Sequence, residues 1–318
     1  SGNDVGVQAR NDLNNLGGSL TASSSLAATA GRDLKVISTT RTESTEQSSN
    51  TRIGRVAGLY VTGANGTLVA SAGRDLRLDA AAILNSAPTG ATAGSTTLAA
   101  GRDLNLGVVT EGTSHHIVWD ANNQRSDASR TDIGTTIQTQ GDIRLQAGGD
   151  LNAKAANVSS DQGAVLATAG GSVKLSAGQA SAQVDETHQQ TSKGLFSSKT
   201  TRNHDTLDQT SALGSTLSGN TTTVLANQDI QVQGSNVVST QGTLLAAQNN
   251  VTVEAAKNTK TESHLSDEKL SGLFGTGGIG FTVGTRQQSV NQDGTTGTAA
   301  ASTVGSLEGN VNLQAGKN

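Results

Sequence analysis

Short triplets of apolar, polar and apolar residues recur along the whole chain. They are Leu34-Lys35-Val36, Leu76-Arg77-Leu78, Leu104-Asn105-Leu106, Ile143-Arg144-Leu145, Val173-Lys174-Leu175, Ile230-Gln231-Val232, Val251-Thr252-Val253 and Val311-Asn312-Leu313. Successive side chains of a β-strand point to opposite faces, so each triplet would bury two aliphatic side chains and expose one polar side chain. A helix would need apolar spacings of three or four residues, which the triplets lack. The pattern therefore predicts many short β-strands.

The residues that precede the triplets also repeat. Gly31-Arg32-Asp33-Leu34 returns at Gly73-Arg74-Asp75-Leu76 and at Gly101-Arg102-Asp103-Leu104. Reduced copies of this anchor are Asn3-Asp4-Val5, Gly141-Asp142-Ile143, Gly149-Asp150-Leu151, Gly171-Ser172-Val173, Gln228-Asp229-Ile230, Asn249-Asn250-Val251 and Gly309-Asn310-Val311. Such self-similarity indicates an array of equivalent units rather than a domain built around one catalytic centre.

A second short strand precedes many anchors, as at Leu26-Ala27-Ala28 and Leu68-Val69-Ala70. The smallest repeat unit, without an insertion, is 21 or 22 residues long. A unit of strand, turn, strand and turn without a helix is typical of one coil of a parallel β-solenoid. Stacked coils would bury a narrow aliphatic column, which agrees with the 3 Phe, 1 Trp and 1 Tyr of the chain. About ten anchors, at ~4.8 Å per stacked strand, predict a rod of roughly 50–65 Å.

A longer period is superimposed on this unit. Anchors that are 71, 75, 79 and 81 residues apart lie at Val5, Leu76, Leu151, Ile230 and Val311. Polar insertions that resemble one another lie between them, at about 39–67, 110–136, 180–223 and 257–305. Their middle parts alternate around glycine, as at 53–61 and 280–284, which favours hairpins that project from one side of the solenoid. We therefore predict one repeat array over residues 1–318 with four hairpin insertions.

Composition narrows the function classes. The net charge is −4 and 15% of the residues are charged, so the chain lacks the electrostatic footprint of a protein that binds nucleic acid or anionic lipid. No apolar run approaches the ~20 residues of a membrane-spanning helix. The chain has no cysteine, which suits a polypeptide threaded unfolded through a pore, although a solenoid also has little need of disulfides. Neither end resembles the cap that a solenoid terminus needs, which predicts a fragment of a larger protein.

Several motifs together resemble a known family. Besides the anchors, they are Leu13-Asn14-Asn15-Leu16-Gly17-Gly18-Ser19-Leu20, Asn157-Val158-Ser159-Ser160, Ser271-Gly272-Leu273-Phe274-Gly275 and Gly277-Gly278-Ile279-Gly280-Phe281. They look like the filamentous-haemagglutinin repeats of large two-partner-secretion exoproteins. The insertions resemble the second repeat class of contact-dependent growth inhibition effectors. The resemblance covers essentially the whole chain.

This resemblance implies an all-β fold, a right-handed parallel β-helix with projecting β-hairpin insertions. It also implies an exoprotein on the surface of a Gram-negative bacterium, exported through an outer-membrane two-partner-secretion transporter and joined to neighbouring domains of the same chain. The expected role is that of a stiff, non-catalytic segment that associates with the target-cell outer membrane and helps a C-terminal toxin to cross it. The alternative is direct adhesion to a receptor or glycan on a host or neighbouring cell. A periplasmic location before deployment is also left open.

Motifs that suggest catalysis or ligand binding favour simpler interpretations. The glycine pattern of 275–280 precedes no predicted helix, so we expect a turn and not a dinucleotide site. The five histidines, at His115, His116, His188, His204 and His264, are expected on solvated hairpins, because no cluster has metal-ligand spacing. The anchor aspartates are expected to cap turns through their side chains rather than bind calcium.

An enzyme on this scaffold would need paired carboxylates near aromatic residues. An aromatic residue and a carboxylate meet at Trp119-Asp120, which we expect to be a packed anchor. We therefore predict no enzymatic activity, no cofactor and no metal. The residues expected to contact a membrane or partner are the apolar side chains of two insertions, Leu195, Phe196, Leu273, Phe274, Ile279 and Phe281.

Overall fold

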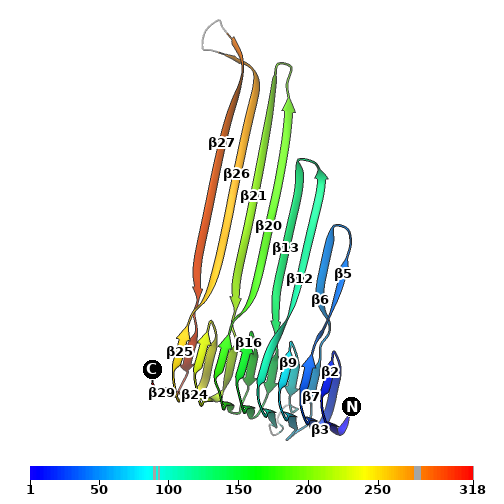
Figure 1. Ribbon diagram of the computed structural model, residues 1–318, viewed down its shortest axis with the longest axis vertical. Coiled ribbons are helices and arrows are strands. Elements are labelled where there is room, and N and C mark those ends of the chain that lie inside the picture. Colours follow the sequence, from blue (N-terminus) through cyan, green and yellow to red (C-terminus); the bar gives the residue numbers. More distant parts are fainter. Residues whose placement is uncertain (89–90, 92–93, 276–280, 318) are drawn as a thin grey trace.

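The computed structural model describes residues 1–317 apart from 89–90, 92–93 and 276–280, and the backbone alone at positions 275 and 281. It consists of a stack of parallel-stranded coils from which four long hairpins rise on one side (Figure 1). The predicted all-β parallel β-helix is confirmed. The longest dimension of this chain runs along the hairpins and not along the coil stack (Figure 1).

Each coil contributes one strand to each of three parallel ladders. The first ladder contains β1 (Gly2–Ala9), the second half of β3 (Ser19–Ala30), β8 (Thr67–Ala72), β11 (Ser95–Ala100), β15 (Ile143–Ala147), β18 (Val165–Ala169), the second halves of β22 (Thr216–Ala226) and β24 (Asn236–Ala247), and β29 (Asn310–Ala315). The second contains β2 (Leu13–Leu16), β4 (Leu34–Ile37), β9 (Leu76–Asp79), the start of β12 (Leu104–Asp120), β16 (Leu151–Lys154), β19 (Val173–Ser176), β23 (Ile230–Gln233) and β25 (Val251–Glu254). The third contains the first halves of β3, β22 and β24 with β7 (Gly58–Val61), β10 (Ala82–Asn85), β14 (Thr136–Thr139), β17 (Asn157–Ser160) and β28 (Thr303–Ser306).

Two details of the predicted coil are wrong. The coil has three strands and not two, because four-residue strands such as β7 and β14 follow the anchor strand. The anchors at Val5, Ile143 and Val311 lie on the first ladder, whereas Leu76, Leu151 and Ile230 lie on the second. The predicted rod length counted all anchors as one stack, but they are divided between two ladders. The second ladder holds eight strands, and seven spacings of ~4.8 Å give a stack of about 34 Å, shorter than the predicted rod.

The interior is the expected aliphatic column. The two apolar residues of the triplets on the second ladder face inward, so that Leu76, Leu78, Val173 and Leu175 are all 0% exposed. The other two ladders add Leu, Ile, Val and Ala to the same cluster. Alternating burial therefore follows the period of two that the sequence shows.

The anchor glycine is required by close stacking at the corner between the first and second ladders. A Cβ at Gly73 would collide with the Gly31 carbonyl oxygen, and a Cβ at Gly101 would collide with that of Gly73. The anchor aspartate does not cap its own turn as predicted. Its carboxylate reaches the next coil: Asp33 accepts hydrogen bonds from Arg74 Nε at 2.8 Å and from the Asp75 backbone N–H at 3.4 Å. Asp12 with Arg32 and Asp75 with Arg102 repeat this arrangement, so the Gly-Arg-Asp motif links coils to one another.

The connection between the second and third ladders alternates along the stack. In every other coil it is a two-residue turn whose first residue has a positive φ, at Gly17 (63°), Ala80 (47°), Ala155 (48°) and Gly234 (54°). In the coils between them, a hairpin replaces that turn. The hairpins are β5 (Thr39–Ser44) with β6 (Ser48–Arg55), β12 with β13 (Asn123–Gly134), β20 (Gly178–Lys193) with β21 (Ser197–Leu213), and β26 (Ala256–Gly275) with β27 (Phe281–Ala300).

This alternation lets the hairpins tile. Stacked coils and neighbouring strands of a sheet are both ~4.8 Å apart, so a hairpin of two strands is as wide as two coils. A hairpin on every coil would overlap its neighbours, and one on every third coil would leave a gap. The first insertion is also shorter than the sequence indicated: β6 ends at Arg55, and Leu59 and Val61 are buried in the solenoid as part of β7.

Each of the three longer hairpins returns to the solenoid through a hydroxyl residue that donates to a backbone carbonyl, either of the preceding coil (Thr135) or of the strand that leads into the same hairpin (Ser215 and Ser302). Thr135 Oγ1 donates to Leu78 O at 2.8 Å, Ser215 Oγ to Ser176 O at 2.8 Å, and Ser302 Oγ to Glu254 O at 2.6 Å. Thr135 and Ser215 are 0% exposed. These bonds tie the base of each of the three hairpins to the coil stack.

Candidate functional site

The four hairpins join edge to edge into one eight-stranded antiparallel sheet, here called the hairpin sheet (Figure 1). The second strand of each hairpin pairs with the first strand of the next: β6 with β12, β13 with β20, and β21 with β26. The paired overlap grows from 4 to 8 to 14 residues along the chain. The hairpins therefore form a staircase that rises from the N-terminal to the C-terminal coils.

A polar side chain bridges each junction where two hairpins part above the solenoid. The backbone N–H of Ile53 donates to Glu111 Oε1 at 2.6 Å, that of Gln179 to Asp132 Oδ2 at 3.1 Å, and that of Ala212 to Asn258 Oδ1 at 2.8 Å. These backbone donors would otherwise lack a partner at the split. We call Glu111, Asp132 and Asn258 the junction clamps. No sequence pattern points to them, because their partners lie 46 to 58 residues away.

Asp132 is the most enclosed of the ion-paired carboxylates on the hairpins. Burial alone would raise the pKa of Asp132, but hydrogen bonds from Lys154, Thr110 and the Gln179 N–H outweigh that effect and hold its pKa below the ordinary value. Lys154 Nζ lies 2.7 Å from Asp132 Oδ2, and Thr110 Oγ1 lies 2.8 Å from Asp132 Oδ1. The carboxylate thus ties one hairpin both to the next hairpin and to the coil beneath it.

The predicted contact residues lie at the top of the hairpin sheet. Leu195 and Phe196 form the tip of the β20–β21 hairpin and are 91% and 68% exposed, and Leu273, near the end of β26, is 39% exposed. The Leu273 N–H donates to Phe196 O at 3.2 Å, so the structure places Phe196 beside Leu273, and Leu195 and Phe274 are their neighbours in sequence. Ile279 and the side chain of Phe281 lie outside the described residues.

Trp119 is exposed at the tip of a shorter hairpin (Figure 1), and its prediction as a packed anchor is wrong. It lies at the tip of the β12–β13 hairpin with its side chain 58% exposed, beside Val118 at 48%. Trp119, Phe196 and Phe274 thus all lie at hairpin tips, whereas Tyr60 lies on β7 in the solenoid. A chain with few aromatic residues places most of them at the far end of its projections.

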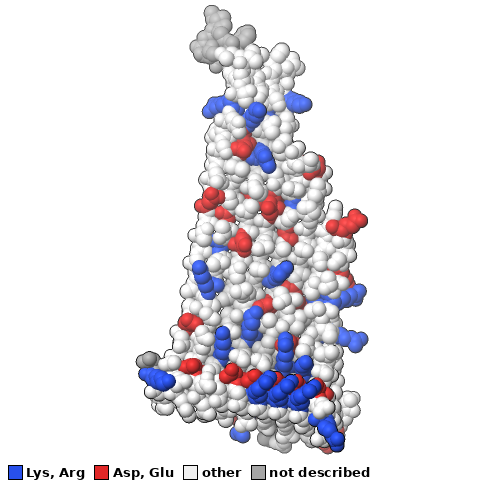
Figure 2. Space-filling model, viewed as in Figure 1, with Lys and Arg blue, Asp and Glu red and all other residues white. Residues whose placement is uncertain are grey.

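Charged side chains are denser along the solenoid than on the upper hairpin sheet (Figure 2). Figure 2 shows Lys and Arg side chains gathered with acidic ones along the solenoid at the base of the view, while uncharged surface dominates the upper hairpin sheet. Within the described part of the chain, no helix is long and apolar enough to span a membrane.

The histidines are better partnered than the sequence suggested. His115 Nδ1 lies 2.8 Å from Asp127 Oδ2, His204 Nε2 lies 3.0 Å from Asp185 Oδ1, and His264 Nδ1 lies 2.7 Å from Asp205 Oδ1. The hydrogen bond from His115, with help from Arg125, holds the pKa of Asp127 below its ordinary value. Across the described residues, no group of three or more His, Cys, Asp or Glu side chains is placed to hold a metal ion.

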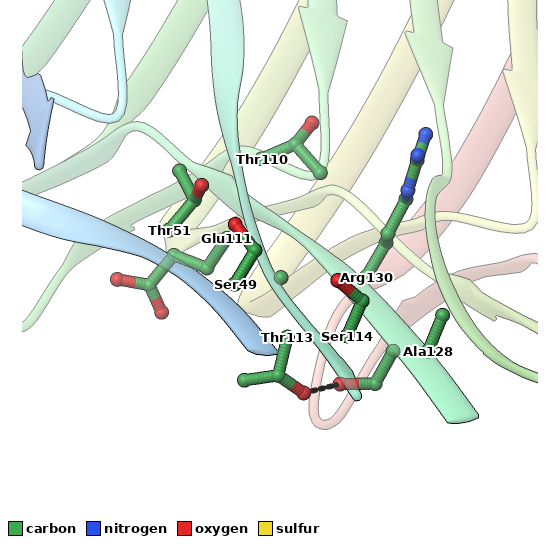
Figure 3. A pocket seen from close by; sticks show the side chains of 10 residues that line it. Ser49, Thr51, Thr110, Glu111, Thr113, Ser114, Ala128 and Arg130 are labelled. Atoms are coloured by element: carbon green, nitrogen blue, oxygen red, sulfur yellow. Dashed lines mark hydrogen bonds between the residues drawn. The ribbon is translucent and has the colours of Figure 1, made fainter. Parts of the chain in front are cut away.

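One open hollow of about 310 Å³ lies on the hairpin sheet where β6 leaves β12 (Figure 3). It is lined by hydroxyl side chains such as Ser49 and Thr51 together with Arg130, and Gly112 leaves space between them. Glu111 also lines the hollow, and its carboxylate accepts the clamp bond from the Ile53 N–H. The hollow thus presents a polar surface made mainly of hydroxyl side chains.

Known proteins match this chain over most of its length. The family described as "Hemagglutinin repeat" matches twice, at residues 55–195 and 196–318. A protein named "tRNA nuclease CdiA" from Escherichia coli strain STEC_O31 is 33% identical over 316 residues, which is 98% of this chain and 9% of the relative. The "16S rRNA endonuclease CdiA" of Enterobacter cloacae is 38% identical over 193 residues, 60% of this chain and 6% of the relative.

A second Escherichia coli protein named "tRNA nuclease CdiA", from strain 536, is 47% identical over 131 residues, 40% of this chain and 4% of the relative. The chain therefore spans less than a tenth of the length of these relatives. No solved structure matches it.

Proposed function

The chain belongs to the Hemagglutinin-repeat family of filamentous-haemagglutinin and contact-dependent growth inhibition exoproteins, as its motifs indicated, and from this premise we propose that it is a non-catalytic segment that engages the target-cell outer membrane through its hairpin tips and assists toxin passage. The solenoid serves as the rigid base, and the hairpin sheet serves as the projecting contact element.

The observation that carries the proposal is the placement of aromatic residues. Trp119, Phe196 and Phe274 lie at the tips of three hairpins, and the tips of the two tallest hairpins are hydrogen-bonded to each other. Tryptophan and other amphipathic rings favour the membrane–water boundary, and exposed apolar patches on a soluble surface mark contact sites. Exposed apolar side chains at the summit of a mainly polar sheet are therefore suited to an apolar target.

The proposed partners follow from the family. An outer-membrane two-partner-secretion transporter would export the chain, the outer membrane of a neighbouring cell or its receptor would meet the hairpin tips, and neighbouring domains of the same polypeptide would carry the toxin. The proposed site of action is the bacterial cell surface, with a periplasmic stage before deployment as a further prediction. The absence of cysteine is compatible with export as an unfolded chain.

The test is a full-length exoprotein in which Leu195, Phe196, Leu273 and Phe274 are all replaced by Ser. A matched control replaces the exposed solenoid residues Val69 and Leu225 by Ser. Export, binding to target cells, flotation with vesicles of outer-membrane lipid, and toxin delivery are measured in parallel. Loss of four apolar contacts should lower vesicle association and delivery by at least about tenfold with normal export, while the control should match the wild type.

Unchanged vesicle association and delivery in the tip variant would overturn the proposal. Loss of cell binding with vesicle association retained would instead support adhesion to a receptor or glycan as the main role.

A further inference from the structure

The two edges of the hairpin sheet differ. Each second strand of the first three hairpins is covered by the first strand of the following hairpin, and this covering is antiparallel in all three cases. β27 is the equivalent second strand of the fourth hairpin. Among the described strands, it pairs with β26 alone.

The edge formed by β5 has the features that block strand addition. It is six residues long, its pairing with β6 is interrupted by an irregularity between Thr39 and Thr40, and it carries Arg41 and Glu43 3.0 Å apart. Short length, bulges and charges are the usual protection of a sheet edge.

The edge formed by β27 is longer and more regular, and its charged residues are sparser. It pairs with β26 over 20 residues without a register shift, contains neither Pro nor Lys, and carries one basic and one acidic residue, Arg286 and Asp293. Its described side chains are almost all exposed, whereas those of β21, which is covered by β26, are mostly half-buried. A long, regular edge of this kind presents a row of free backbone donors and acceptors.

We propose that β27 is a strand-addition site, and that its occupant is the first strand of another hairpin of this repeat class, bound antiparallel. The three existing junctions define the chemistry of that occupant. β20 and β26, which occupy the equivalent position on β13 and β21, are rich in Ser, Thr and Gln or Asn side chains. Backbone hydrogen bonds supply the affinity in this mode of recognition, and side chains supply the register.

The junction clamps predict one more feature of the occupant. In two of the three junctions the incoming strand carries the clamp, Glu111 on β12 and Asn258 on β26. An incoming strand should therefore bear an acidic or amide side chain near its base, able to accept from the backbone of β27 close to the solenoid. The inference concerns the sheet edge and does not depend on the membrane role proposed for the tips.

The test uses the whole chain and a fluorescent synthetic peptide with the sequence of β20, residues 178–193. Consecutive residues of a strand direct their N–H groups to opposite sides. Of the two variants Ser289→Pro and Val290→Pro, one therefore removes an N–H that faces β26 and the other removes an N–H on the free edge. Hydrogen exchange of the β26 and β27 amides reports whether the hairpin survives. The matched control is Thr42→Pro on β5.

The wild-type chain and the Thr42→Pro variant should bind the peptide saturably, and a scrambled peptide should not bind. One of the two β27 variants should keep the hairpin intact and weaken peptide binding by roughly tenfold. The proline removes one backbone donor from the free edge, and its ring hinders the approach of the peptide. Since the chain has no native cysteine, Val290→Cys offers a second readout. Peptides with one cysteine at successive positions should form a disulfide with it at one preferred register.

Peptide binding that neither proline variant weakens, or disulfide formation without a preferred register, would overturn the assignment of the edge. Absence of saturable binding would overturn it as well. Self-association of the wild-type chain that is lost in the β27 variants, and that the peptide does not displace, would identify a second copy of β27 as the occupant instead.

Discussion

The carboxylate of Asp132 accepts a hydrogen bond from the backbone N–H of Gln179 at 3.1 Å, at the point where two hairpins part above the solenoid. The two residues are 47 positions apart in sequence and belong to hairpins two coils apart. The same oxygen lies 2.7 Å from Lys154 Nζ, so one side chain connects two hairpins and a coil.

Replacing Asp132 by Ala should loosen the second hairpin from the third. The change leaves the Gln179 N–H and the Lys154 ammonium without their partner, which should lower the free energy of unfolding by about 2 kcal/mol. Denaturant unfolding measures this loss, and hydrogen exchange at Gln179 locates it. Asp132→Asn retains an acceptor and should lose less, while Asp161→Ala on a solenoid turn should change little. Equal protection of Gln179 in the wild type and the Ala variant would contradict the clamp.

Acid should weaken the ion pairs that join the Asp of one anchor to the Arg of the anchor on the next coil. The Arg32 hydrogen bond is the main cause that lowers the pKa of Asp12 from 3.8 to about 2, and Arg74 lowers the pKa of Asp33 in the same way. Because the folded-state pKa lies below the unfolded one, this stabilisation is complete above the unfolded pKa and is lost as pH falls through the folded value. Stability should therefore be level above pH 5 and fall between about pH 4 and pH 2.

An Asp12→Asn variant should show a smaller decline over this range. The measurement is the denaturation midpoint as a function of pH. A midpoint that stays constant down to pH 2 would argue against these Asp–Arg pairs as a source of stability.

Stacking of the anchor glycines predicts intolerance to a single methyl group. Gly101→Ala places a Cβ against the Gly73 carbonyl oxygen, and the rigid backbone on both sides leaves little room for adjustment. The expected loss is about 2 kcal/mol, seen in denaturant unfolding. Gly6→Ala is the matched control, because a Cβ at Gly6 meets no atom within 4 Å. Equal effects of the two substitutions would contradict this account.

The left-handed turn at Ala80 predicts how the stabilities of variants at this position rank. A left-handed conformation costs an L-residue roughly 1–2 kcal/mol, and Gly avoids that cost. Gly also gains conformational freedom in the unfolded chain, which offsets the benefit, so Ala80→Gly should leave the free energy of unfolding nearly unchanged. Ala80→Val should lose at least about 1 kcal/mol, because β-branched residues fit this region poorly. Thermal unfolding of the three forms checks the order, and a stabilised Val variant would contradict it.

The alternation of faces can be tested at two adjacent positions. Val173 is 0% exposed, whereas Lys174 points outward on the same strand. Val173→Asp should cost more than about 3 kcal/mol, because an unpaired carboxylate would enter the aliphatic column. Lys174→Asp should stay within about 0.5 kcal/mol of the wild type. Melting temperatures measure both, and an unchanged value for the first variant would mean that the faces are assigned wrongly.

The sequence by itself determined the repeated parts of this protein. Strict alternation at triplets such as Val173-Lys174-Leu175 identified the strands and their buried face, because a period of two follows from local backbone geometry. The recurrence of Gly-Arg-Asp fixed the solenoid, and the shared polar insertions indicated hairpins. The apolar residues Leu195 and Phe196 stood out because they interrupt a polar stretch.

The tertiary structure alone decided how these parts meet. Ile143 and Leu151 share an anchor motif but lie on different ladders, because ladder membership depends on which strands stack and not on the motif. Fusion of the hairpins depends on the match between the width of two coils and that of one hairpin. The clamps depend on this fusion, since each clamp bonds a partner 46 to 58 residues away in sequence.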